Sequence, residues 1–247
     1  STEVVLGIRK IIWATNTIYT MYTHDNININ EDDYYVYTSD KRIYKCLDNY
    51  NNSPSTVEPN STSLTPFSTS DGYKWQLMYS VDASTASKWV NDDVIPAFIV
   101  TEDDESTQWN VQQAAIPGTI DAIRIENGGS GYLTSPTINI IGDGTGATAE
   151  AILTSGVITK ITITNRGSGY TYAEVSVSGA AELTAIISPT KGHGANAVEE
   201  LNGHYIIVRA EYNKDESGEF PIDIAYRQIG LISNPYLYGT TTESTET

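Results

Sequence analysis

Two glycine-rich tetrads are the first places in this sequence where residue types and spacing could do chemistry. Residues 129–132 and 167–170 both read Gly-Ser-Gly-Tyr. Such a loop binds phosphate when it connects a strand to a helix, because the first helical amides then face the anion. Here Pro136 and a strand-like run follow the first tetrad, and no Gly-Lys-Ser/Thr accompanies either one. We therefore predict scaffold turns whose glycines supply positive φ and whose tyrosines lie over a sheet: Gly129, Gly131, Tyr132, Gly167, Gly169 and Tyr170.

The side chains that most often carry catalysis are few. The histidines are His24, His193 and His204, none at a zinc-ligand spacing, and the single Cys46 cannot complete a zinc site. No Gly-x-Ser-x-Gly elbow of a serine hydrolase is present. We interpret His193 as a flexible loop residue and Cys46, in a strand-like run, as a buried structural thiol. A pair of carboxylates for glycoside hydrolysis stays open in so acidic a chain, but no pair can be named.

The charge balance argues against several partners. Lys and Arg total 14 against 31 Asp and Glu, a formal charge of −17. An acidic surface repels phosphate backbones, so no nucleic-acid partner is expected. The acidic runs 31–33 and 102–105 are interpreted as solvated loops, with cation binding as the alternative. No long apolar run and no secretory leader is found, so we expect synthesis in a cytoplasm and no membrane partner. Since no zinc-ligand spacing and no phosphate-loop motif is present, no metal or cofactor is expected either.

The elements that hold these residues are expected to be strands. Tyr outnumbers Phe 17 to 3, which suits half-buried strands and contact surfaces. Strand-like runs cover 3–23, 33–45, 72–81 and 205–211, with a helix over 4–14 as the alternative for the first. A short helix is predicted over 83–90, capped by Asp82. Residues 49–72 are almost all polar or Pro and predict a long loop.

The centre of the chain is an internal repeat. Residues 118–126 align without gaps onto 156–164, and the two tetrads then fall in register. Alternation predicts that Ile123 and Ile125 point inward, as do their counterparts Ile161 and Ile163. Two further strands follow in each copy, at 137–141 and 148–153 and at 174–178 and 183–187. Each copy is therefore expected to form a three-stranded unit, and the two units to cover each other's apolar faces.

Four segments outside the repeat resemble a known family. They are residues 40–49 (DKRIYKCLDN), 55–59 (STVEP), 71–81 (DGYKWQLMYSV) and 220–235 (FPIDIAYRQIGLISNP). In this order they are similar to the dimeric baseplate wedge family of T4-like contractile-tailed bacteriophages, the products of gene eight. The resemblance covers roughly residues 3–100 and 200–236. Its most specific residues are Asp71, Gly72, Tyr73, Trp75, Tyr226, Arg227, Asn234 and Pro235.

The resemblance implies a mainly β fold, a layered β-sandwich body formed by 1–115 and 189–247. The repeat, 116–188, would then be a small inserted β domain of two three-stranded repeats, which the T4 protein lacks. The family is not enzymatic; its members form homodimers that link other wedge proteins in the virion tail baseplate, without a small-molecule substrate. Within such a body Asp71-Gly72 makes a tight turn, and the loop 49–72 orders against neighbouring subunits.

Two readings compete with a structural baseplate role. A carbohydrate-binding or host-surface adhesion module is the first, because β-sandwiches with exposed Tyr and Trp bind sugars by stacking. A tail-associated hydrolase with an acidic pair is the second. The position of Tyr73 and Trp75 is also open between two alternatives: one buried face of a core strand, or an exposed aromatic stripe used in assembly.

Overall fold

The computed structural model describes residues 2–212 and 226–233, and the side chains of 3–209. The predicted mainly β fold is confirmed. The chain divides into two compact units, one of residues 1–10, 81–101 and 197–247, the other of 11–80 and 102–196. These boundaries differ from the expected body and insertion, because the repeat belongs to the same unit as residues 11–80.

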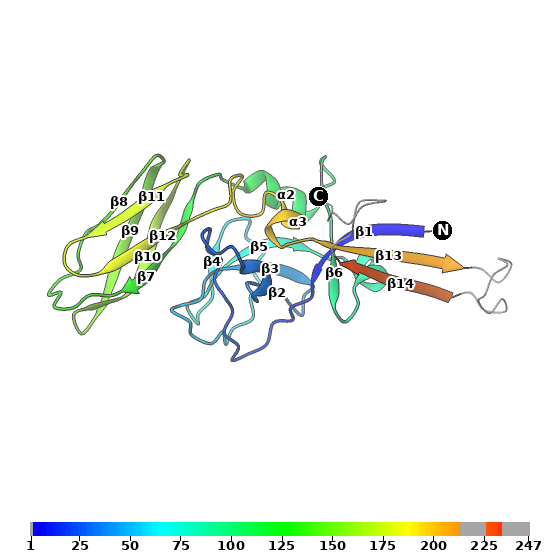
Figure 1. Ribbon diagram of the computed structural model, residues 1–247, viewed down its shortest axis with the longest axis horizontal. Helices are drawn as coiled ribbons and strands as arrows, with labels where there is room; N and C mark the ends of the chain where they lie inside the picture. Colours follow the sequence, from blue (N-terminus) through cyan, green and yellow to red (C-terminus); the bar gives the residue numbers. More distant parts are fainter. Residues whose placement is uncertain (1, 213–225, 234–247) are drawn as a thin grey trace. The chain divides into compact units, whose positions relative to one another are not determined.

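The first unit is built on one antiparallel sheet, in the order β14-β13-β1-β6 (Figure 1). The strands are β1 (Thr2–Arg9), β6 (Val94–Ala97), β13 (Tyr205–Tyr212) and β14 (Tyr226–Ser233). The start of the chain is thus a strand and not the alternative helix. Helix α1 (Ala83–Trp89) begins at Asp82, whose carboxylate accepts the amides of Ser84 and Thr85 as predicted, and α3 covers Ala197–Glu200.

Part of the family-like ending lies in this sheet. Tyr226 and Arg227 open β14, where they lie opposite Tyr212 and Glu211 of β13. Asn234 and Pro235 lie outside the described residues. The core on this sheet contains Trp89, Val94 and Ile207.

The second unit contains another antiparallel sheet, in the order β2-β3-β5-β4. Its strands are β2 (Tyr35–Tyr37), β3 (Arg42–Asp48), β4 (Phe67–Ser68) and β5 (Lys74–Ser80), preceded by the short 3₁₀ helix η1 (Ile29–Glu31). Helix α2 (Thr107–Ala114), which the sequence patterns did not predict, packs beside β5. Its first turn is capped by the Ser106 hydroxyl, which accepts the amide of Trp109 at 3.0 Å.

The aromatic residues of the family motif form the core of this sheet. Tyr73 and Trp75 have 0% exposure, and their rings stack with centroids 5.3 Å apart. Tyr19 meets Trp75 edge-on at 5.9 Å. The core alternative is therefore the one observed, and the exposed stripe is not. Gln76 and Met78 are buried as well, so β5 is covered on both faces and not on one.

Asp71 fixes the long loop before β5. Its Oδ2 accepts the backbone amides of Thr56 at 2.8 Å and Val57 at 3.0 Å, and its Oδ1 accepts the Thr69 hydroxyl at 2.5 Å. Burial alone would raise the pKa of Asp71, but these hydrogen bonds outweigh it and lower the pKa. Gly72 follows with φ +93°. The loop 49–72, expected to order against other subunits, is thus held by hydrogen bonds within the chain.

All six strands predicted for the repeat are present, and each copy contributes three. They are β7 (Ile120–Asn127), β8 (Ile138–Gly142), β9 (Thr145–Thr154), β10 (Val157–Ser168), β11 (Ala173–Val177) and β12 (Glu182–Ile187). The hydrogen-bonded pairs are β7 with β12, β8 with β11 and β9 with β10. Every pair joins one copy to the other. The expectation that each copy forms a three-stranded unit of its own is therefore corrected.

A tight turn between the copies accounts for this pairing. Ser155 and Gly156, which separate β9 from β10, both have positive φ, +53° and +75°. Two consecutive residues of positive φ match the type I′ turn of a two-residue hairpin, whose twist suits the flanking strands. The last strand of one copy is thereby paired with the first strand of the next.

The six strands surround one shared core (Figure 1). Besides the three ladders, β7 lies beside β10, β8 beside β9 and β11 beside β12. Ile123 and Ile161 are buried, while Ile125 and Ile163 are half-buried against the same core, as the alternation predicts. Duplication therefore produced one core, not two.

The tetrads connect the copies reciprocally. Their glycines Gly129, Gly131, Gly167 and Gly169 have φ between +62° and +79°. The amide of Tyr132 donates to the carbonyl of Gly156 at 3.1 Å, and the amide of Tyr170 donates to that of Gly118 at 3.0 Å. Gly118 and Gly156 occupy equivalent places in the alignment, so the two bonds are related by the duplication. These turns belong to the scaffold.

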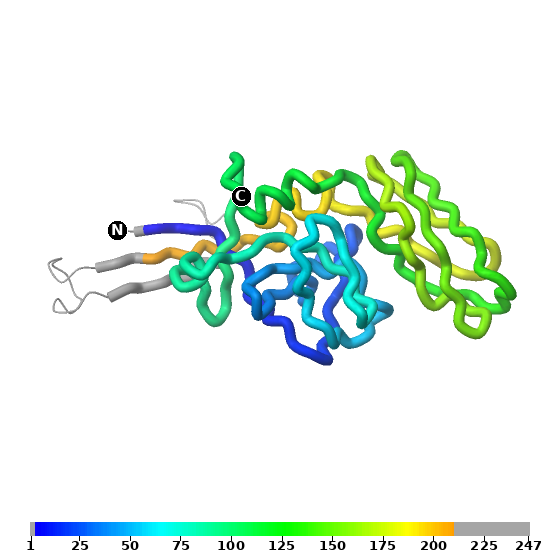
Figure 2. The backbone as a smooth tube through the Cα atoms, turned by 180° about the vertical axis from the view of Figure 1, so that it is seen from behind, coloured from blue at the N-terminus to red at the C-terminus, as the bar shows by residue number. Residues whose placement is uncertain are grey.

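The two ends of the repeat meet. The amide of Ser188 donates to the carbonyl of Thr119 at 2.8 Å, and the amide of Thr119 donates to Ser188 Oγ at 3.0 Å. Figure 2 shows the chain entering the repeat in green and leaving it in yellow side by side. A segment with adjoining ends has the geometry of an insertion.

Candidate functional site

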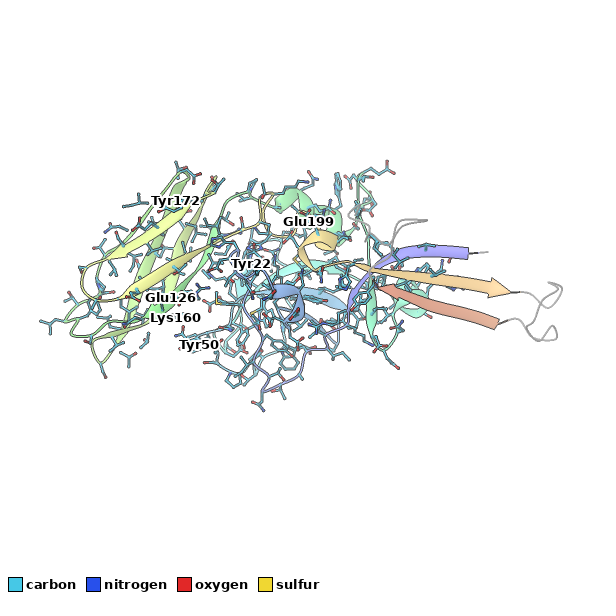
Figure 3. The ribbon with its side chains drawn as sticks, viewed as in Figure 1. Tyr22, Tyr50, Glu126, Lys160, Tyr172 and Glu199 are labelled. Carbon is cyan, nitrogen blue, oxygen red and sulfur yellow. The ribbon has the colours of Figure 1, made fainter. Side chains whose placement is uncertain are left out.

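A polar cleft lies in the second unit, between the turn after β3 and the strands β7 and β10. It encloses a volume of about 330 Å³. Tyr50, Glu126 and Lys160 lie close together there (Figure 3). The lining residues are Met21, Asp48, Asn49, Tyr50, Asn51, Asn52, Ile123, Arg124, Ile125, Glu126, Lys160 and Ile161. A second hollow of about 350 Å³ shares Met21, Asn49, Asn52 and Arg124 with the first, so the two are contiguous.

The turn on one side of the cleft has an unusual backbone. Tyr50, Asn51 and Asn52 are consecutive, and all have left-handed φ, between +51° and +58°. For residues with a side chain this conformation costs about 1–2 kcal/mol each, with Asn among the most tolerant. Strain of this kind persists where surrounding contacts fix it, and it is concentrated at functional sites.

Those contacts are present around the turn. The buried Asn49 donates from Nδ2 to the carbonyl of Tyr19 at 3.0 Å and accepts the amide of Asn52 at 3.1 Å. Asp48 Oδ1 accepts the amide of Tyr50 at 2.8 Å. Across the cleft, Asn51 Nδ2 donates to the carbonyl of Thr159 at 2.6 Å. The turn is thus held in place before any ligand arrives.

Charges of both signs line the cleft. Arg124 binds Glu126 at 2.5 Å and Asp25 at 3.2 Å, so its single positive charge is paired with two carboxylates. Burial raises the pKa of Asp25, but its hydrogen bonds with Arg124 and Thr23 and the charge of Arg124 together outweigh this and lower the pKa. Burial also raises the pKa of Asp48, only partly opposed by the amide of Tyr50 and the charges of Lys74 and Lys160.

Several polar atoms of the cleft keep spare hydrogen-bonding capacity. The Lys160 ammonium lies over the Tyr50 ring, 5.0 Å from its centroid. Neither this ammonium nor Asp48 Oδ2, Glu126 Oε2 or Asn52 Nδ2 is hydrogen-bonded to another residue in the described part of the chain. Two of these groups donate hydrogen bonds and two accept them.

The tetrads and the family-like motif, which the sequence patterns singled out as candidate site residues, do not line this cleft. Neither the tetrads nor Asp71, Gly72, Tyr73 and Trp75 are among its lining residues; they build turns and core. Gly72 supports the cleft from behind, because a Cβ at that position would meet the Tyr50 ring at 2.7 Å. The one signal available in the sequence was the Asn-rich run 48–52, typical of left-handed turns.

A second polar cluster is buried between β7, β10 and β5. Asp121 binds Arg166 and accepts the Thr119 hydroxyl at 2.7 Å. His193 Nε2 lies 3.8 Å from the Asp121 carboxylate, and the Lys74 ammonium donates to the backbone carbonyl of Asp121 at 2.6 Å. The His193 side chain is only 1% exposed, so the interpretation as a flexible loop residue is wrong. The cluster anchors the repeat to residues 11–80.

The remaining candidate chemical groups show no sign of a reactive or metal-binding site in the described residues. Cys46 is buried, as predicted, and burial raises the pKa of its thiol. Among residues 2–212 and 226–233, no group of three or more His, Cys, Asp or Glu side chains could hold a metal ion. Within the same residues no helix is long and apolar enough to cross a membrane.

Comparison with known proteins finds no similar protein. No protein-family model, curated protein or solved structure matches this chain. What the cleft can bind follows from its own residues.

Proposed function

We propose that this protein is a non-catalytic structural component of a contractile phage tail baseplate, a wedge subunit that forms a homodimer and links neighbouring baseplate proteins. The proposal is supported by where the family-like residues lie. Segments 40–49 and 71–81 contribute the paired strands β3 and β5, and Ile43, Cys46 and Trp75 are fully buried there. The resemblance therefore falls on residues whose identity is set by packing, which is where related folds keep their pattern.

A subunit of this kind acts through contact area. A permanent interface of about 2,000 Å² or more holds subunits together without any reacting group. Contacts of that size need an ordered surface, and the hydrogen bonds of Asp71 give the polar loop 49–72 such order. The virion is accordingly the place where this protein is expected to be found.

Immunogold labelling of purified virions with antibody against this chain tests the proposal. Gold at the base of a contractile tail on every particle is the expected result. Gold on fibre tips would instead support the adhesion module, and no gold on any particle would refute both. Analytical ultracentrifugation of the purified protein tests the dimer, which requires twice the chain mass of 27.0 kDa.

A further inference from the structure

We propose that the cleft between residues 48–52 and strands β7 and β10 binds a neutral saccharide, either free or as part of a polysaccharide. The proposal concerns this cleft alone and does not depend on the baseplate role. Saccharide sites combine polar side chains that bind hydroxyl groups with small apolar surfaces that contact C–H faces.

The charges of the cleft favour a neutral ligand. Arg124 pairs with both Glu126 and Asp25, so these three side chains carry one net negative charge, and Asp48 and Lys160 add one charge of each sign. An anion bound to Lys160 would also face Asp48 and Glu126, and a cation bound to Asp48 would face Lys160. Since either ion meets a like charge at short range, a neutral polar ligand is favoured.

The spare hydrogen-bonding groups favour hydroxyls in particular. Asp48 Oδ2 and Glu126 Oε2 need donors, while Lys160 Nζ and Asn52 Nδ2 need acceptors. A hydroxyl group is both donor and acceptor, so adjacent hydroxyls of a sugar ring satisfy both kinds at once. Three of the four groups are charged and would make charge-assisted hydrogen bonds, and the fourth, Asn52, would donate from an amide.

The rest of the lining suits a sugar ring. Met21 and Ile125 are half-buried and offer apolar surface to C–H groups. The volume of about 330 Å³ lies at the lower end of the range of ligand pockets, about 300–1,000 Å³, and so fits a short saccharide. The turn 50–52 is already held by Asn49 and Asp48, so little conformational entropy is lost on binding.

Isothermal titration calorimetry of the full chain tests this inference. The probes are glucose, galactose, mannose, N-acetylglucosamine, lactose and maltose, with dextran as a polysaccharide and inorganic phosphate as an anion. At least one saccharide should bind saturably with a Kd on the order of 1 mM. Preference for dextran over the short sugars would assign a polysaccharide source, and the reverse a free sugar.

Matched variants locate the site. Lys160→Met and Glu126→Gln should each weaken binding about tenfold, the effect of losing one charge-assisted hydrogen bond. The controls Lys191→Met and Glu182→Gln, exposed and outside the cleft, should bind as wild type does. If Lys160→Met folds poorly, Asn52→Gly removes a cleft amide while keeping the left-handed φ.

Three outcomes would overturn the inference. The first is no saturable binding of any saccharide up to about 100 mM, where a site of this strength would be filled. The second is binding that the cleft variants leave unchanged, since the site would then lie elsewhere. The third is phosphate binding tighter than that of every saccharide, because the cleft would then select an anion.

Discussion

Arg166 of one repeat copy binds the buried carboxylate of Asp121 in the other, with Nη2 3.0 Å from Oδ2. Asp121 is also the residue whose carbonyl accepts the Lys74 ammonium from β5. This ion pair joins the two copies, and the Lys74 hydrogen bond joins the first copy to residues 11–80. The Asp121 side chain is only 3% exposed, so its carboxylate depends on protein groups for its hydrogen bonds.

Removing one partner of this pair should be strongly destabilising. Asp121→Ala leaves a cation without its carboxylate, and we expect a loss of about 3–5 kcal/mol in the free energy of unfolding. Urea denaturation followed by circular dichroism measures this loss, with Glu182→Ala, at the exposed first position of β12, as a near-neutral control. The double variant Asp121→Leu/Arg166→Met should lose less than the two single changes together. Strict additivity would contradict the pairing.

Two glycines that both have left-handed φ but different surroundings separate crowding from backbone strain. Gly131 has φ +79° and open space around its Cβ position, so Gly131→Ala should cost about 1–2 kcal/mol. Gly118 has φ +62°, and a Cβ there would meet the amide nitrogen of Tyr170 at 2.3 Å. We expect Gly118→Ala to cost clearly more, or to prevent folding. Equal melting temperatures for the two variants would refute the close contact between the copies.

The ring of Trp75 should contribute strongly to the stability of the fold, and its N–H group should not. Trp75→Ala removes a fully buried side chain, and we expect a loss of about 3–5 kcal/mol in the free energy of unfolding. Trp75 Nε1 has no hydrogen-bond partner among the described residues. Trp75→Phe, which keeps much of the ring stack with Tyr73, should therefore cost far less than Trp75→Ala. A Trp75→Ala variant that melts within a degree or two of wild type would exclude this core.

Tyr73 should make the protein sensitive to alkali. Burial raises the pKa of Tyr73 to about 12, above its ordinary value of 10.0. Above pH 10 the tyrosine of the unfolded chain ionises while the buried Tyr73 of the folded chain stays neutral. The folded state therefore keeps its full stability below about pH 10 and loses part of it as pH rises to about 12. Tyr73→Phe should be less stable at pH 7, because the hydrogen bond to the carbonyl of Ser53 at 2.6 Å is lost. The free energy of unfolding, measured with urea between pH 8 and 12, should fall less steeply with pH for Tyr73→Phe than for wild type. Identical slopes would argue against the ionisation of Tyr73 as a cause of the decline.

Much of the repeat follows from the order of its residues alone. Period-two alternation identifies Ile123 and Ile161 as inward, and the tetrads identify the turns. The partner of each strand cannot be identified in this way. Because the copies have nearly the same pattern, pairing within a copy and pairing between copies satisfy the same alternation. The I′ turn at Ser155 and Gly156 decides between them, and a Ser-Gly pair is a weak signal in isolation.

The cleft could not be predicted, for a different reason. Its sides come from positions as distant as Asp48, Arg124 and Lys160, and no local motif connects them. His193 was misinterpreted for the same reason: glycines on both sides indicate mobility, but packing against Tyr22, with ring centroids 5.0 Å apart, fixes the ring. Local composition does not reveal contacts between distant segments.

A single copy of the repeat should not fold. Each of its strands has its ladder partner in the other copy, so a peptide of residues 116–154 has neither sheet nor covered core. We expect an unfolded circular dichroism spectrum for this peptide and for residues 155–190. Mixed in equal amounts, the two should produce a β spectrum whose strength rises with concentration. A β spectrum from either peptide alone would contradict the pairing between copies.

The meeting of Thr119 and Ser188 also bears on how such a chain could arise. A segment that begins and ends at one point can be joined to its host at a single loop with neighbouring ends. Recombination could move it between unrelated scaffolds as a single cassette, with the host strands left in register. The same property makes it a graft for engineers: a binding surface could be added to a carrier protein through one short gap, without redesign of the carrier.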